Sequence, residues 1–203
     1  MRIAFKEWAV VVEALGRGRQ SLILRKGGIA EGPDGFVVDH REFLLFPTRF
    51  HQEAGQVVPE ARDLLPPPAG SAAVPPPDRV LIEFFAVVTG WRQLRSLDEA
   101  LALSGQHVWT PEVIASRFDW GGEASISMIA LRIFRLPRRH DLTLLPAYGG
   151  CRSWVELTEP LPVEGATPVL SEAIHSRRMA AIGDALGAPW LPAPTRGSPA
   201  RTP

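Results

Sequence analysis

The first quarter of the chain carries short apolar stretches separated by glycine-containing turns. Residues 8–12 and 21–24 are rich in β-branched or large apolar side chains, and a turn-like segment with two glycines separates them. This pattern predicts a β-hairpin. A competing interpretation is a helix over residues 4–15, because four apolar side chains in it recur at helical spacing. A further strand is expected over residues 43–46, where Pro47 would end it.

Beyond residue 78 the pattern predicts strands that alternate with capped helices. Residues 80–89 are apolar on both faces except at Glu83, which is typical of a strand inside a sheet. Ser96 followed by Glu99 forms a capping box that opens a helix, and Thr110 with Pro111 opens another. The remaining expected elements are a long strand over 126–136, a shorter strand over 152–157 and a last helix that Thr167-Pro168 opens and Gly187 ends.

These elements predict an α+β fold with one mixed or antiparallel sheet, a few short helices and a C-terminal helix. Their order is similar to that of PUA-like pseudobarrels, a group that includes base-reading domains; this is an analogy of fold alone. Two proline clusters divide the chain. We expect a hairpin-containing part over 1–65, a proline-rich linker or loop over 66–78, an α+β part over 79–187 that packs with 1–65 as one domain, and a disordered tail over 188–203.

Composition and charge narrow the classes of function. Apolar residues make up 45% of the 203 positions and charged residues 22%, as in ordinary globular proteins. No apolar run is long enough to cross a bilayer and no secretory signal is visible, so we expect a cytoplasmic protein that does not bind membranes. The formal net charge is zero, which disfavours a strong grip on duplex phosphates. Recognition of a single base or strand end remains compatible with that balance.

Several blocks of the chain are dense in Trp, His, Arg and Gly. They are Phe5-Lys6-Glu7-Trp8, Leu24-Arg25-Lys26-Gly27-Gly28-Ile29, Phe46-Pro47-Thr48-Arg49-Phe50-His51-Gln52, His107-Val108-Trp109-Thr110, Arg117-Phe118, Leu131-Arg132-Ile133-Phe134-Arg135-Leu136 and Tyr148-Gly149-Gly150-Cys151-Arg152-Ser153-Trp154-Val155. Together these blocks resemble a bacterial family known as domain of unknown function 1802. The resemblance covers about residues 4–158. It implies a bacterial origin and, through an occasional association with restriction-type nuclease domains, work near DNA. The chain itself lacks the acidic–lysine spacing of such nucleases.

The first functional hypothesis is a binding module that recognises a nucleotide or a nucleic-acid feature, in the role of a restriction or defence accessory. Its expected ligand-binding residues are Lys6, Trp8, Arg25, Lys26, Thr48, His51 and Gln52. The two lysines and Arg25 would hold a phosphate, together with backbone N–H groups of the adjacent glycines. An exposed tryptophan would stack on a base. The competing interpretation of the same residues is a tryptophan-filled core with a solvated strand end.

Two alternatives use other residues. A hydrolase or transferase would use Cys151 as its nucleophile, with His51, His107 or His140 as the base. A structural or partner-binding protein would use the proline-rich linker as a docking segment. The five histidines and the single cysteine show no zinc-ligand spacing, and no cofactor fingerprint is present, so we expect neither a metal nor a cofactor.

Overall fold

The computed structural model of the chain describes residues 1–26, 40–49, 53–67, 76–122, 124–150, 152–187 and 191–192. In chain order its elements are β1 (Ile3–Trp8), α1 (Ala9–Gly16), β2 (Leu22–Arg25), β3 (Glu42–Thr48), η1 (Ala54–Gln56), η2 (Pro59–Leu64), β4 (Arg79–Leu94), α2 (Leu97–Ala102), α3 (Pro111–Asp119), η3 (Trp120–Gly122), β5 (Ile126–Thr143), η4 (Pro146–Tyr148), β6 (Trp154–Glu156), β7 (Thr167–Pro168), α4 (Glu172–Leu186) and β8 (Leu191–Pro192). None of the helices in these ranges has the length and apolar character that a membrane span requires.

All the described strands belong to one sheet. Its main path runs β2-β5-β4-β3-β1-β6, with β7 added beside β5 and β8 beside β4. Strands β1 and β3 are parallel, and the other described pairs are antiparallel. The predicted α+β class, with a mixed sheet, short helices and a C-terminal helix, is therefore confirmed. Strands from both sides of the proline-rich segment 66–78, most of which lies outside the described residues, pair in this sheet.

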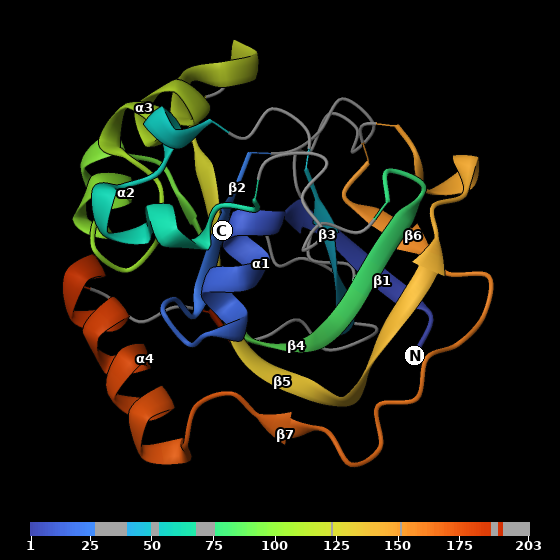
Figure 1. Cartoon of the computed structure of the whole chain (residues 1–203). Coiled ribbons are helices and arrows are strands. Elements are labelled where there is room, and N and C mark those ends of the chain that lie inside the picture. Colours follow the sequence, from blue (N-terminus) through green and yellow to red (C-terminus); the bar gives the residue numbers. More distant parts are fainter. Residues whose placement is uncertain are drawn as a thin grey trace.

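The sheet is open and strongly curved. Its two long strands, β4 and β5, change register between Ile82 and Phe84 and again between Val88 and Gly90. Such irregularities bend a strand and increase its twist. The two edges of the sheet approach each other, because Arg25 at the end of β2 donates a hydrogen bond to Ser153, just before β6. Figure 1 shows α2, α3 and α4 at one side of the molecule, β1, β3 and β6 at the other, and α1 between them. This arrangement agrees with the expected pseudobarrel.

The N-terminal region differs from the predicted hairpin. Residues 9–16 form helix α1 in place of the first arm, while the second arm is present as β2, which pairs with β5 instead. The competing helix interpretation was closer, although β1 occupies its first turn. Helix α1 buries side chains around most of its surface, as a helix enclosed on all sides does. Burial among the strands outweighs the β preference of its three consecutive valines.

Two further boundaries differ for local reasons. Strand β3 continues through Pro47 instead of ending there. Pairing of β3 with β4 ends at Leu44, so the missing N–H of Pro47 interrupts no ladder on that side. The last helix begins at Glu172 with Ser171 as its cap, whereas Thr167 and Pro168 form β7. It ends at Gly187 in the left-handed conformation, as predicted.

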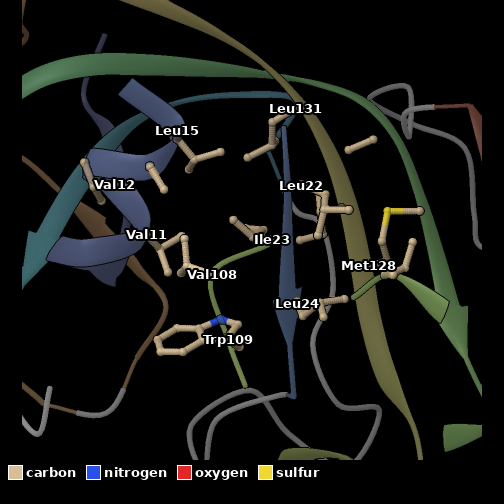
Figure 2. Packing of buried hydrophobic residues seen from close by; sticks show 14 of the residues in the cluster. Val11, Val12, Leu15, Leu22, Ile23, Leu24, Val108, Trp109, Met128 and Leu131 are labelled. Atoms are coloured by element: carbon tan, nitrogen blue, oxygen red, sulfur yellow. The ribbon is translucent and has the colours of Figure 1, made fainter. Parts of the chain in front are cut away.

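Apolar side chains fill both faces of the sheet. Along β3, Phe43 and Leu45 lie in the larger core with α1, whereas Leu44 and Phe46 lie in a second core on the opposite face. Figure 2 shows Val11 and Leu15 of α1 pointing toward β2, with Val108 and Trp109 packed alongside. The larger core thus joins α1 and β2 to the segment before α3, and this junction positions the candidate site.

Candidate functional site

Charged and aromatic side chains gather where β1, β2 and β3 end. Trp8 and Thr48 are register partners at the ends of the two parallel strands, and Arg25 is the last residue of β2. We define the strand-end cluster as Glu7, Trp8, Arg25, Lys26, Thr48, His107, Trp109 and Arg117. Three cations and one carboxylate of this set carry a formal charge of +2, counting Arg25, Lys26 and Arg117 against Glu7, in a chain whose net charge is zero.

Glu7 is the buried acid of the cluster. Only 2% of its side chain is exposed, because the alternation of β1 places it on the same inward face as Phe5. One carboxylate oxygen accepts the backbone N–H of Trp8 at 2.8 Å, and the other lies 3.7 Å from Nη1 of Arg25. Arg25 also donates through Nη2 to Ser153 Oγ at 2.5 Å. The guanidinium of Arg25 is thereby fixed from both halves of the chain.

Arg117, on α3, lies against two indole rings. Its Cζ is 4.1 Å from the ring centroid of Trp109 and 5.2 Å from that of Trp8. The two indoles meet edge to face with their centroids 4.9 Å apart. Burial lowers the pKa of Arg117, Glu7 raises it and Arg25 lowers it further, yet a guanidinium stays charged in proteins. Stacking on aromatic faces fixes the plane of this cation and leaves its edge for hydrogen bonds.

His107 lies beside this stack and is almost fully buried. Its Nδ1 accepts the backbone N–H of Trp109 at 3.2 Å. Burial, assisted by the positive charge of Arg117, lowers the pKa of His107 from 6.5 to about 4. The imidazole is therefore neutral at pH 7 and, with Nδ1 acting as acceptor, carries its proton on Nε2. A base of such low pKa is poorly matched to proton transfer near neutral pH.

The lowered pKa of His107 predicts how the free energy of unfolding depends on pH. Between pH 6.5 and about 4, the unfolded chain binds a proton that the folded chain does not, so stability falls as the pH falls. We expect the free energy of unfolding to drop by about 2 kcal/mol between pH 7.5 and 5 on account of this residue. Urea unfolding at several pH values, compared with His107→Asn, measures the difference. An equal pH dependence in both proteins would contradict the assignment.

The two predicted phosphate lysines bind carbonyl groups of the chain. Lys26 Nζ donates to the carbonyls of Phe118 and Ser125, at 2.8 and 2.9 Å, and so ties the end of α3 to the start of β5. Lys6 Nζ donates to the carbonyls of Tyr148 and Gly150, at 2.9 and 2.7 Å. Its position in β1 points it to the face opposite Glu7. Lys26 thus holds its place within the strand-end cluster, whereas Lys6 supports the turn before residue 151.

The structure brings together most, but not all, of the predicted ligand-binding residues that it describes. Trp8, Arg25, Lys26 and Thr48 belong to one cluster, and the Thr48 hydroxyl donates to the backbone carbonyl of Glu7 at 3.2 Å. The predicted residues His51, Gln52 and Cys151, and the glycines after Lys26, lie outside the described residues. The Cys151 enzyme and the proline-linker docking segment therefore stay predictions. Among the described residues, no group of three His, Cys, Asp or Glu side chains could hold a metal.

Sequence reasoning missed two central members of the cluster, Glu7 and Arg117. A signal for Glu7 exists, because it occupies an inward position two residues after Phe5 in a strand. Charged residues at such positions are rarely fully buried without a partner, so an arginine nearby could have been sought. Arg117 precedes Phe118 on an amphipathic helix, and its stacking depends on tryptophans from two other segments. No local pattern predicts that contact.

Comparisons with known proteins agree with the family resemblance. A family model described as "Domain of unknown function (DUF1802)" matches residues 4–181, which extends the expected range into α4. No curated protein matches the chain.

Solved structures similar to this chain include three of the ASCH protein from Zymomonas mobilis, two of them single-substitution mutants. The mutants align at 10% identity with TM-scores of 0.45 and 0.44, covering 89% and 88% of this chain and 94% and 96% of theirs. The unsubstituted protein aligns at 10% identity with a TM-score of 0.38, covering 88% and 93%. At these scores the likeness supports no argument about site residues.

Proposed function

The chain belongs to the family described as a domain of unknown function, DUF1802, and from its own residues we propose that it is a binding module for a nucleotide or a nucleic-acid feature. The binding surface is the strand-end cluster and the adjacent end of α3. The observation that carries the proposal is the Arg117 guanidinium held against two indole rings beside the fixed Arg25. Oriented guanidinium groups and indoles are the side chains that bind phosphates and stack on bases.

An exposed indole that follows α3 is the proposed stacking surface. Trp120 is 53% exposed and follows directly on α3, two residues after the carbonyl that Lys26 holds. The indole of Trp120 is largely exposed to solvent, whereas those of Trp8 and Trp109 are already occupied by Arg117. Trp120 follows Arg117 by three residues in the chain, so we propose that a base stacked on its indole belongs to the same ligand that the arginines bind. The proposal therefore assigns stacking to Trp120 and charge recognition to the arginines.

The charge of the chain limits how much nucleic acid the module contacts. A net charge of zero, with a local excess of +2 in the cluster, suits one or two phosphates better than a long track along a strand. The ligand is accordingly a short feature, such as a single-stranded segment or an end. This limit predicts a shallow salt dependence, with a slope of log K against log salt of roughly −1.5.

Substitution of Trp120 tests the proposal. We expect Trp120→Ala to weaken binding of a fluorescent single-stranded oligonucleotide of about eight nucleotides roughly tenfold or more, because stacking of one base is lost. Fluorescence anisotropy with DNA and RNA versions at several salt concentrations measures the affinity. Ile174→Ala is the matched control, because Ile174 is the other described large apolar side chain that is exposed, at 41%, and it lies on α4. Absence of salt-sensitive binding to every oligonucleotide would overturn the proposal.

A further inference from the structure

We infer that Arg117 and His107 form one recognition site for a terminal phosphate group, the phosphate monoester at the end of a nucleotide or strand. This inference rests on the proposed function and names the part of the ligand that the strand-end cluster reads. It depends on three observations. The guanidinium N–H groups of Arg117 donate no hydrogen bond to a described residue, the Nε2 donor of His107 is buried, and charged side chains surround both.

Arg117 has hydrogen-bonding capacity that the described part of the chain does not use. Its guanidinium contacts the faces of Trp109 and Trp8, and no described residue accepts a hydrogen bond from it. A guanidinium carries five N–H donors in one plane, arranged to hold two oxygens of a phosphate or carboxylate at once. The residue is only partly exposed, so its donors are oriented before any ligand arrives. An anionic group with several oxygens is the matching ligand.

His107 supplies a second unused hydrogen-bond donor, its Nε2. Its Nε2 is buried and has no hydrogen-bond partner, while Nδ1 is occupied by the backbone of Trp109. A buried donor without a partner is uncommon and often marks a functional position. The side chain is 5% exposed and close enough to Arg117 to feel its charge. Trp109 connects the two donors, because its backbone contacts the imidazole and its ring contacts the guanidinium.

The surrounding charges favour a phosphate that carries more than one negative charge. Arg25 and Lys26 lie near Arg117, and Glu7 is the carboxylate whose charge acts on it. A terminal phosphate has a charge between about −1.5 and −2 at pH 7 and three free oxygens, whereas an internal phosphodiester has one charge and two. Because the net charge of the whole chain is zero, the protein has no excess of cations to bind several consecutive phosphodiesters. A single terminal phosphate monoester can balance the excess positive charge of the cluster.

Lys26 is a positioning residue in this arrangement. By holding the carbonyl of Phe118, it fixes the end of α3 one residue after Arg117. Its second bond, to the carbonyl of Ser125, anchors that end to the strand that pairs with β2. The plane of the Arg117 guanidinium therefore depends on Lys26 even though the lysine need not touch the ligand.

Two oligonucleotides that differ only at one end test the inference. We expect the wild-type protein to bind a single strand of about eight nucleotides with a terminal phosphate about tenfold more tightly than the same strand with a hydroxyl. Both 5′ and 3′ phosphates are compared, with inorganic phosphate as competitor. Arg117→Lys keeps the charge and loses the planar fork, so it should abolish the preference. His107→Asn should reduce it. Arg19→Lys, at an exposed arginine paired with Asp63, should leave it unchanged.

The outcomes separate this inference from the proposed function. Equal affinity for phosphate and hydroxyl ends, with salt-sensitive binding intact, would overturn the terminal-phosphate site and leave the binding module standing. A preference that survives in Arg117→Lys, in a protein whose thermal unfolding is unchanged, would show that another group reads the phosphate. If neither strand binds, both proposals fail. Melting curves of each variant keep loss of binding distinct from loss of folding.

Discussion

Replacing Glu7 by glutamine is expected to lower the free energy of unfolding by about 3 kcal/mol, because it leaves the partly buried cations Arg25 and Arg117 without their counter-charge. The carboxylate is 2% exposed and lies 3.7 Å from the Arg25 guanidinium, and its charge also acts on Arg117. Glutamine preserves the size of the side chain and an oxygen for the Trp8 N–H. The substitution therefore removes the negative charge of the side chain and little else. Urea unfolding at pH 7, followed by tryptophan fluorescence, measures it.

Glu13→Gln provides the control for this prediction. Glu13 also pairs with an arginine, Arg17, at 2.6 Å, but both side chains are more than 40% exposed. Solvent screens such pairs, so we expect a change of about 0.5 kcal/mol there. Similar small losses in both variants would contradict the view that the charge of Glu7 holds the cluster together. A loss in Glu7→Gln that disappears when Arg25 is also replaced would assign the effect to that pair.

Gly16→Ala is expected to destabilise the protein by about 3 kcal/mol, although alanine normally favours a helix. A Cβ at Gly16 would lie 2.3, 2.5 and 2.9 Å from three ring atoms of Phe84, which is 4% exposed. The ring has little freedom to retreat, because the Arg135 guanidinium lies 4.6 Å from its centroid and also donates to the carbonyl of Gly16. Either α1 or β4 must shift. Thermal and urea unfolding measure the loss in the free energy of unfolding.

Gly183→Ala, in the interior of α4, is the matched control for steric crowding. A Cβ there would meet no atom within 4 Å. The same substitution should stabilise the protein by about 0.5 to 1 kcal/mol, because alanine loses less backbone entropy in a helix. Opposite signs for the two variants are the expected result. A stabilising Gly16→Ala would mean that α1 does not pack against Phe84 as described.

Much of the fold follows from local patterns in the sequence. Ser96 accepts the N–H of Asp98, Pro111 occupies the first turn of α3, and Gly187 ends α4. The strand expected over 80–89 is present within β4, and the strand over 126–136 within β5. These features were predictable because capping, proline geometry and alternation act over a few residues. The hairpin prediction failed where burial on all sides decided the structure of residues 9–12.

The candidate site was predictable in part. Trp8, Arg25, Lys26 and Thr48 were expected from the family-like blocks and do lie at one end of the sheet. The role of Lys26 was not predictable, because the sequence does not distinguish a lysine that binds two carbonyls from a solvated one. The role of Arg117 required knowing that Trp8 and Trp109 meet, and 101 positions separate them in the sequence.

By itself the sequence determined the family, the α+β class and the helix caps, because those features depend on residue types at short spacings. The tertiary structure alone decided which residues share the site. Arg25 and Ser153 are 128 positions apart, and they meet because irregular, twisted strands bring the two edges of the sheet together. Pairing over such separations depends on the packing of the whole core, which no short window of sequence contains.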